Sequence, residues 1–99
     1  MTDKLTASEV LERLKQLSSD WLYNDSESRI ERAFKFRNYH ECMAFSNAVA
    51  WIAHQKDHHP DMLITYNTCI VVFTTHSAKG ITALDINCAR EVDWLLPNV

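Results

Sequence analysis

Residues 57–76 read DHHPDMLITYNTCIVVFTTH, and this stretch decides how the chain is organised. Two runs rich in apolar and β-branched residues, Met62–Tyr66 and Cys69–Thr75, lie on either side of the pair Asn67-Thr68. Two such runs joined by two polar residues predict a β-hairpin with a tight turn. A histidine pair precedes the first run and a third histidine follows the second run, so the hairpin also decides where these side chains lie.

The predicted hairpin brings the histidines at its two ends together. A turn at this position places Ile64 opposite Val71 and, farther out, His59 opposite His76. Directly opposed residues have Cβ atoms roughly 4.5–5.5 Å apart. Because His58 precedes His59, all three imidazoles are expected around one end of the hairpin. An imidazole can give or take a proton near neutral pH, and positioned acid–base groups typically accelerate a reaction by about 10²–10⁴-fold.

Capping residues predict three helices outside the hairpin. A Ser or Thr followed by an acidic residue three positions later satisfies the first amide groups of a helix, and Asn at a helix start does the same. Pro60 prevents the middle helix from continuing into the hairpin. The predicted caps are Thr6 with Glu9, Asn38 before a helix over Tyr39–Gln55, and Thr82 with Asp85 before a last helix that Pro97 ends.

Two more strands complete the pattern. Trp21–Tyr23 is predicted as a short strand, Asn24–Ser28 as a turn, and Arg29–Phe36 as a half-buried strand because its apolar residues alternate. The order is then helix, strand, strand, helix, strand, strand, helix. We therefore predict one α+β domain spanning residues 1–99, in which three helices pack on one face of a four-stranded antiparallel sheet.

Composition narrows the class of protein. The chain has 99 residues, of which 46% are hydrophobic, which suits one small globular domain. Its longest apolar run, Cys69–Phe73, is too short to cross a membrane, and its first residues lack the features of a signal peptide, so we expect a cytoplasmic protein. The formal net charge of −3 argues against a nucleic-acid partner. Ile70 and Val72, on the sheet face away from the helices, favour a homodimer or homotetramer.

Other side chains have simpler interpretations. The three cysteines are predicted to be reduced and buried, because they are an odd set without close spacing. Acidic residues interrupt the one basic cluster, which favours a solvated strand face over a binding site. This cluster consists of Arg29, Arg32, Lys35 and Arg37, with Glu27 and Glu31 among them.

Three alternatives to acid–base catalysis remain open for the histidines. His58 at the end of a helix would interact favourably with the helix dipole without any catalytic role. His54 and His58 have the spacing of two zinc ligands on one helix, although the sequence HQKDH lacks the glutamate of the zinc-protease motif. Nucleophilic catalysis is the weakest alternative, because no Ser or Cys lies in a strained, glycine-flanked turn.

One set of spacings stands out: His58-His59-Pro60, then Tyr66 after five residues, His76 after nine more and Asp85 after eight more. This spacing resembles the signature of the pterin-4a-carbinolamine dehydratases. The segments AFKFRNYHECMAF and TALDIN also resemble parts of that family, and the resemblance runs from about Trp21 to Val92. His54, four residues before His58, also occupies a matching position.

The resemblance implies the fold given above and a specific reaction. Aromatic amino acid hydroxylases leave their tetrahydropterin as a 4a-hydroxy adduct. Members of the family eliminate water from this adduct and give the quinonoid dihydropterin, so that tetrahydrobiopterin is recycled. The resemblance implies no metal and no organic cofactor, because the pterin is itself the substrate.

The resemblance also assigns the site residues. His58, His59 and His76 are expected to be catalytic, and the expected register makes His59 and His76 the pair that moves protons. Pro60, Tyr66 and Asp85 are expected at the substrate-binding site. Tyr66 either stacks near the pterin or packs in the core, and Asp85 either binds the polar edge of the pterin or only caps its helix.

A second class of function remains beside the enzyme. Some animal members of the family also bind a homeodomain transcription factor, so the chain could act as a pterin-binding or protein-interaction module with little activity. The expected partners are then a transcription factor or an aromatic amino acid hydroxylase. The complete set of three histidines favours the enzyme.

Overall fold

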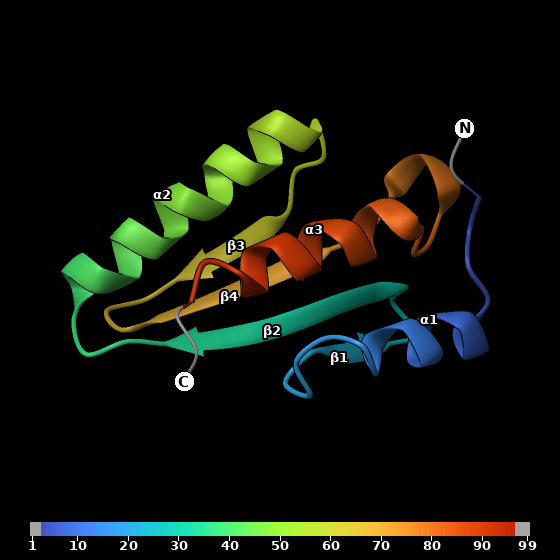
Figure 1. Ribbon diagram of the computed structural model, residues 1–99, viewed down its shortest axis with the longest axis horizontal. Helices are drawn as coiled ribbons and strands as arrows, with labels where there is room; N and C mark the ends of the chain where they lie inside the picture. The colour runs from blue at the N-terminus through green and yellow to red at the C-terminus, as the bar shows by residue number, and fades with distance from the viewer. Residues whose placement is uncertain (1–2, 97–99) are drawn as a thin grey trace.

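The helices of this protein lie over one face of an antiparallel sheet, as Figure 1 shows. This computed structural model describes residues 3–96. The observed order confirms the predicted succession of helices and strands. The elements are α1 (Ala7–Leu14), β1 (Leu22–Asn24), β2 (Arg29–Lys35), α2 (Tyr39–Lys56), β3 (Asp61–Ile64), β4 (Thr68–Phe73), the short 3₁₀ helix η1 (His76–Ala78) and α3 (Ala83–Asp93).

The sheet has the strand order β1-β2-β4-β3, and every neighbouring pair is antiparallel. The hairpin of β3 and β4 is confirmed, but its predicted register is wrong by two residues. Ile64 pairs with Cys69 rather than with Val71. The cause is the turn, since the Thr65 N–H donates to the Thr68 carbonyl (2.9 Å) and Thr68 already belongs to the strand. A shift of two residues keeps every side chain on its predicted face.

The predicted helix starts are confirmed in detail. Thr6 with Glu9 and Thr82 with Asp85 form complete capping boxes, and the Asn38 side chain accepts a hydrogen bond from the third residue of α2. The predicted end of α2 is correct to within one residue, since the helix reaches Lys56, whereas α3 ends earlier than predicted. α1 stops at Leu14 and α3 at Asp93, and the following chain packs its leucines on the core without remaining helical. The predicted stop at Pro97 lies outside the described residues.

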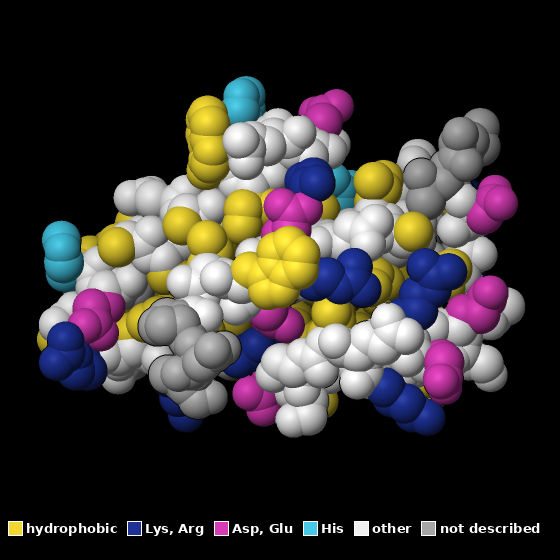
Figure 2. All heavy atoms as spheres, viewed as in Figure 1, with side chains coloured by type: hydrophobic (Ala, Val, Ile, Leu, Met, Phe, Trp, Pro, Cys, Tyr) yellow, Lys and Arg dark blue, Asp and Glu magenta, His cyan; other side chains and the backbone are white. Residues whose placement is uncertain are grey.

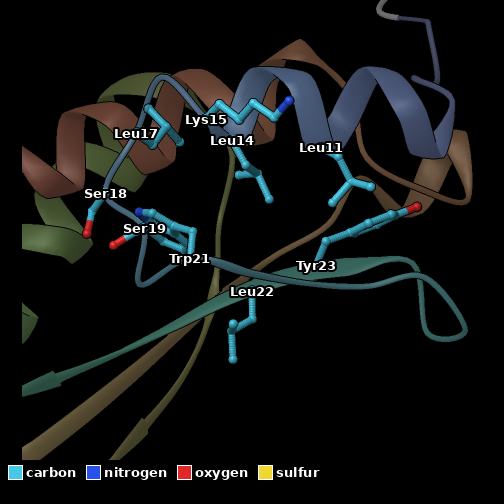
Figure 3. A pocket seen from close by; sticks show the side chains of 9 residues that line it. All are labelled: Leu11, Leu14, Lys15, Leu17, Ser18, Ser19, Trp21, Leu22 and Tyr23. Atoms are coloured by element: carbon cyan, nitrogen blue, oxygen red, sulfur yellow. The ribbon is translucent and has the colours of Figure 1, made fainter.

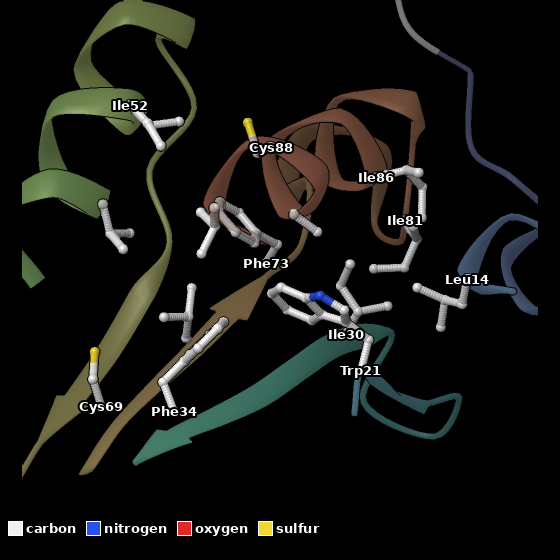
Figure 4. Packing of buried hydrophobic residues seen from close by; sticks show 14 of the residues in the cluster. Leu14, Trp21, Ile30, Phe34, Ile52, Cys69, Phe73, Ile81, Ile86 and Cys88 are labelled. Atoms are coloured by element: carbon white, nitrogen blue, oxygen red, sulfur yellow. The ribbon is translucent and has the colours of Figure 1, made fainter. Parts of the chain in front are cut away.

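The first strand begins one residue later than expected. It covers Leu22–Asn24, and Trp21 before it turns into the core, where its indole N–H donates to Asp93 (2.9 Å). Figure 4 shows the indole among the buried side chains, beside Ile30 of β2. The core fills the space between the sheet and the helices, and it fixes where both ends of the β3–β4 hairpin lie relative to α2 and α3.

Surface residues bear out some expectations and correct others. Arg32 lies on the core face of β2 and pairs with Asp93 (2.8 Å), so the basic cluster is not a solvated strand face throughout. Trp51 and Trp94 are 60% and 72% exposed. Figure 2 shows acidic and basic side chains interspersed on the viewed face.

On the sheet face away from the helices, the Leu63 side chain is exposed. The homo-oligomer stays a prediction.

Across residues 3–96, no helix has the length and the apolar character that crossing a membrane requires.

Candidate active site

The three predicted histidines line one hollow of about 280 Å³. The hollow lies where α2 ends, beside the chain that follows β4. The predicted convergence of the imidazoles is therefore confirmed, although the register from which it was counted was wrong. The lining residues are Asp57, His58, His59, Thr74, Thr75, His76 and Ser77.

The end of α2 fixes the position of His58. Asp57 adopts the left-handed conformation (φ 50°) that ends the helix, and the His58 N–H donates to the Ala53 carbonyl (3.1 Å). This bond spans the last turn, as in the Schellman motif that satisfies carbonyl groups at helix ends. Pro60 then restricts His59 to an extended conformation, which directs the chain into β3. The histidine pair is thus placed by a helix end on one side and a strand start on the other.

His58 makes a short contact with Asp85 at the start of α3. Its Nε2 atom lies 2.6 Å from Asp85 Oδ1, and the His58 side chain is 11% exposed. The His58 ring also lies nearly parallel to the ring of Phe73, with an angle of 11° between the planes and 6.0 Å between the centroids. A hydrogen bond at one nitrogen and a stacked ring on one face together hold the imidazole in a single orientation.

Asp85 is completely buried, and several donors converge on it. Its Oδ2 atom accepts hydrogen bonds from the Thr82 N–H (2.9 Å) and the Thr75 hydroxyl (2.7 Å). The carboxylate therefore completes the predicted helix cap and at the same time faces His58. The contact between Asp85 and His58 was not predicted. No local pattern could have revealed it, because the two residues are 27 positions apart.

His76 is presented to the hollow by a short loop. The backbone of Thr75 pairs with Gly80 through hydrogen bonds of 2.9 and 3.3 Å, and the chain between them forms η1, which was not predicted. Lys79 closes this loop in the left-handed conformation (φ 57°). Both His76 and His59 are exposed, in contrast to His58. The site therefore combines one fixed imidazole with two that solvent and ligands can reach.

Three of the predicted site residues do not line the hollow: Asp85, which contacts His58, and also Tyr66 and Pro60. Tyr66 lies in the β3–β4 turn, 64% exposed, and stacks on Tyr39 with 6.5 Å between the ring centroids. The six residues of β4 separate this turn from the histidines, which corresponds to about 20 Å. Figure 1 shows the turn at the opposite end of the hairpin from η1. Pro60 is half-buried next to His59 and does not line the hollow.

A larger hollow of about 670 Å³ lies between α1 and β1, and Figure 3 shows its lining. Four of its nine lining residues are leucines, and its titratable groups are Lys15 and Tyr23. Burial raises the pKa of Tyr23, and the hydrogen bond to Asp25 adds to the rise. The hollow with the histidines is the better candidate for acid–base chemistry, because imidazole is the side chain whose ordinary pKa lies near neutral pH.

The described residues contain no group of three or more His, Cys, Asp or Glu side chains arranged to hold a metal ion. His54, the other member of the spacing considered for zinc, is exposed and packs beside Trp51, with 5.5 Å between the ring centroids.

Comparisons with known proteins agree on one family. The family described as pterin 4 alpha carbinolamine dehydratase matches residues 3–95. A Nitrosomonas eutropha protein named "Putative pterin-4-alpha-carbinolamine dehydratase" is 53% identical over 84% of this chain and 72% of its own length. A Legionella pneumophila protein with the same name is 44% identical over 93% of this chain and 81% of its own. A crystal structure from Brucella melitensis, described as a transcriptional coactivator/pterin dehydratase, superposes with a TM-score of 0.90 at 36% identity, covering 96% of this chain and all of that one.

Proposed function

Because this chain belongs to the pterin 4 alpha carbinolamine dehydratase family, we propose that it is a hydro-lyase that removes water from 4a-hydroxytetrahydropterin. One observation carries the proposal. Three imidazoles from separate segments, His58 and His59 after α2 and His76 after β4, line a single hollow. The proposed product is the quinonoid dihydropterin, and the proposed role is tetrahydrobiopterin recycling in the cytoplasm.

The proposed reaction needs one proton given and one proton taken. An imidazolium protonates the 4a-hydroxyl group, the bond between C4a and oxygen breaks, and water leaves. A neutral imidazole accepts the proton of a ring nitrogen as the double bond from C4a to that nitrogen forms. No net proton is consumed, and the reaction as proposed uses no metal or organic cofactor.

We assign the two proton transfers to His59 and His76. Their exposure at the hollow supports this assignment. The register expected from the sequence, which first suggested this pair, is wrong by two residues and gives no support. His58 is held against Asp85 and is better suited to orient the pterin. Asp85 is buried beneath His58, so we propose that it acts through His58 rather than by binding the pterin. The distant Tyr66 has no role in this proposal.

The test is the dehydration rate of freshly generated 4a-hydroxytetrahydropterin, followed by ultraviolet absorbance in the presence of a chelator. The adduct also loses water unaided, so rates with and without protein are compared. We expect a rate that rises in proportion to protein and does not change with the chelator. A rate equal to the unaided one would refute the proposed activity.

Histidine variants test the site. We expect His59→Ala and His76→Ala each to lower kcat by about 10²-fold or more, because each removes a positioned acid or base. Both side chains are exposed, so the fold should persist, which circular dichroism checks. His40→Ala is the matched control, since His40 is an exposed histidine outside the hollow. Full activity in the double variant of His59 and His76 would show that the site is assigned wrongly.

A second candidate function rests on the Brucella melitensis structure, whose description names a transcriptional coactivator as well as a dehydratase. In this alternative the chain is a pterin-binding or protein-interaction module, and a transcription factor or an aromatic amino acid hydroxylase is the partner. The exposed Trp51 and Trp94 would then be available to a partner. Loss of the histidines should abolish dehydration but leave binding to such a partner intact, which separates the two functions.

A further inference from the structure

We propose that Thr75 is a positioning residue that acts through Asp85 to hold His58 in the tautomer with its proton on Nε2. The remaining nitrogen, Nδ1, is then a hydrogen-bond acceptor for an N–H group of the ligand. The part of this inference that concerns the tautomer stands on the hydrogen-bond network alone. The part that concerns the ligand rests on the proposed function, because a pterin ring carries N–H donors.

The direction of each hydrogen bond follows from counting protons. The Thr75 hydroxyl has one proton and donates it to Asp85 Oδ2 (2.7 Å). Thr75 Oγ1 also lies 2.9 Å from Thr82 Oγ1, so the Thr82 hydroxyl must be the donor in that contact. Thr82 Oγ1 in turn accepts from the Leu84 N–H (3.2 Å). The chain of donors therefore runs from the α3 backbone through both threonines to Asp85.

This series of hydrogen bonds determines which nitrogen of His58 carries the proton. Asp85 Oδ2 accepts two hydrogen bonds, from Thr75 and from the Thr82 N–H, so a proton in the pair of Asp85 and His58 could lie only between Oδ1 and Nε2. The oxygens of a carboxylate only accept hydrogen bonds, so we place that proton on the ring. His58 Nε2 is therefore the donor to Asp85 Oδ1. Only Nδ1 of the neutral ring is left with a lone pair.

Thr75 connects the fixed imidazole to the rest of the site. Its side chain is buried and holds Asp85, and its backbone pairs with Gly80 to form the loop that starts with His76. One residue therefore fixes the ring orientation of His58 and the position of His76 at the same time. The spacing that resembles the family does not include Thr75, so only the structure assigns it this role.

The first test measures the His58 ring nitrogens by ¹⁵N NMR in the ligand-free protein at about pH 8, where an unperturbed imidazole is neutral. We expect the proton on Nε2, in slow exchange with water because Asp85 accepts it. In Thr75→Val, which has the same shape but no hydroxyl, this proton should exchange faster. Thr75→Ser should restore the slow exchange. Thr74→Val controls for the loss of a neighbouring threonine hydroxyl, since Thr74 bonds to the Ser28 carbonyl instead.

A His58 proton found on Nδ1 in the unaltered protein would overturn the proposal, whether or not any variant folds. Unchanged exchange in a folded Thr75→Val would overturn the role of Thr75. These measurements use no substrate, so they can succeed even if the chain has no dehydratase activity.

The second test is kinetic. We expect Thr75→Val to raise KM for the 4a-hydroxytetrahydropterin by about tenfold with a smaller change in kcat, because an oriented hydrogen bond to the ligand is weakened. Thr75→Ser should return KM to its original value. A merely structural role would lower the amount of folded enzyme and leave KM unchanged, so an unchanged KM in Thr75→Val would contradict the inference about the ligand.

Discussion

Cys88 of α3 shows at the scale of one residue how burial changes chemistry. The side chain is 1% exposed, and burial raises the pKa of its thiol to about 11, with the nearby carboxylates of Asp85 and Glu91 adding to the rise. Cys42 and Cys69 are also free and buried. The prediction of reduced, buried cysteines is thereby confirmed for all three.

The raised pKa predicts how stability depends on pH. Above pH 9 the unfolded chain releases the Cys88 proton, whereas the folded chain keeps it up to about pH 11. The contribution of this thiol is therefore complete below pH 9 and is lost as the pH rises from 9 to 11, by about 1.4 kcal/mol per pH unit. Urea unfolding of the unaltered protein and Cys88→Ala measures the effect. The stability difference between them should fall by about 1.4 kcal/mol from pH 8 to pH 10, and a constant difference would contradict the prediction.

The residue scale also shows what the sequence could and could not predict about the site. The convergence of the histidines could be predicted, because a hairpin brings the residues before its first strand close to the residues after its second strand. An error of two residues in register did not separate them. The contact of His58 with Asp85 could not be found, because it depends on how α3 packs against the end of α2. Thr75 was missed for the same reason, because its side chain acts through a hydrogen bond to Asp85, ten positions away in the sequence.

At the scale of elements, helix starts were predicted more accurately than helix ends. A start is marked by one side chain that satisfies free amide groups, and Asn38 is such a residue for α2. The ends depend on the whole core. The chain after Leu14 and after Asp93 leaves the helix although its apolar spacing continues. The strand register likewise depended on which two residues form the turn, and sequence preferences at Tyr66-Asn67-Thr68 did not decide this.

Loss of the cap at Asn38 tests the importance of a helix start. The Asn38 side chain accepts a hydrogen bond from the Glu41 N–H (2.9 Å). We expect Asn38→Ala to lower the free energy of unfolding by about 1 kcal/mol, because this amide loses its partner. Urea denaturation followed by circular dichroism measures the change. Asn38→Ser is the control, since serine also caps helices, and equal losses in both variants would rule out the cap as the cause.

At the scale of the whole molecule, Asp93 joins segments that are far apart in the sequence. It accepts hydrogen bonds from the Trp21 indole N–H (2.9 Å), the Ser18 N–H (3.4 Å) and Arg32 (2.8 Å). The end of α3 is thereby fixed to β2 and to the chain before β1. The Asp93 and Arg32 side chains are 15% and 13% exposed, so little solvent screens the pair.

Removal of Asp93 should therefore be costly. We expect Asp93→Ala to lower the free energy of unfolding by about 2–4 kcal/mol, because the Arg32 charge and the Trp21 N–H lose their buried partner. Asp20 also faces Arg32, at 3.5 Å, but it is 68% exposed. Asp20→Ala is thus the matched control, with an expected loss below about 1 kcal/mol. Urea denaturation compares the two, and similar losses would show that burial of the pair is not what matters.

All the polar groups of the candidate site come from one continuous segment, from Asp57 to Asp85, although the whole chain is needed to support it. The first half of the sequence supplies supporting structure and no side chain that lines the hollow. We therefore expect substitutions before α2 to change mainly the stability of the fold, and substitutions from Asp57 to Asp85 to change the proposed activity as well. For a protein engineer, a second domain is better joined at the β3–β4 turn, which lies about 20 Å from the histidines. The turn Asn24–Ser28 is less suitable, because the Ser28 carbonyl accepts a hydrogen bond from Thr74 at the hollow.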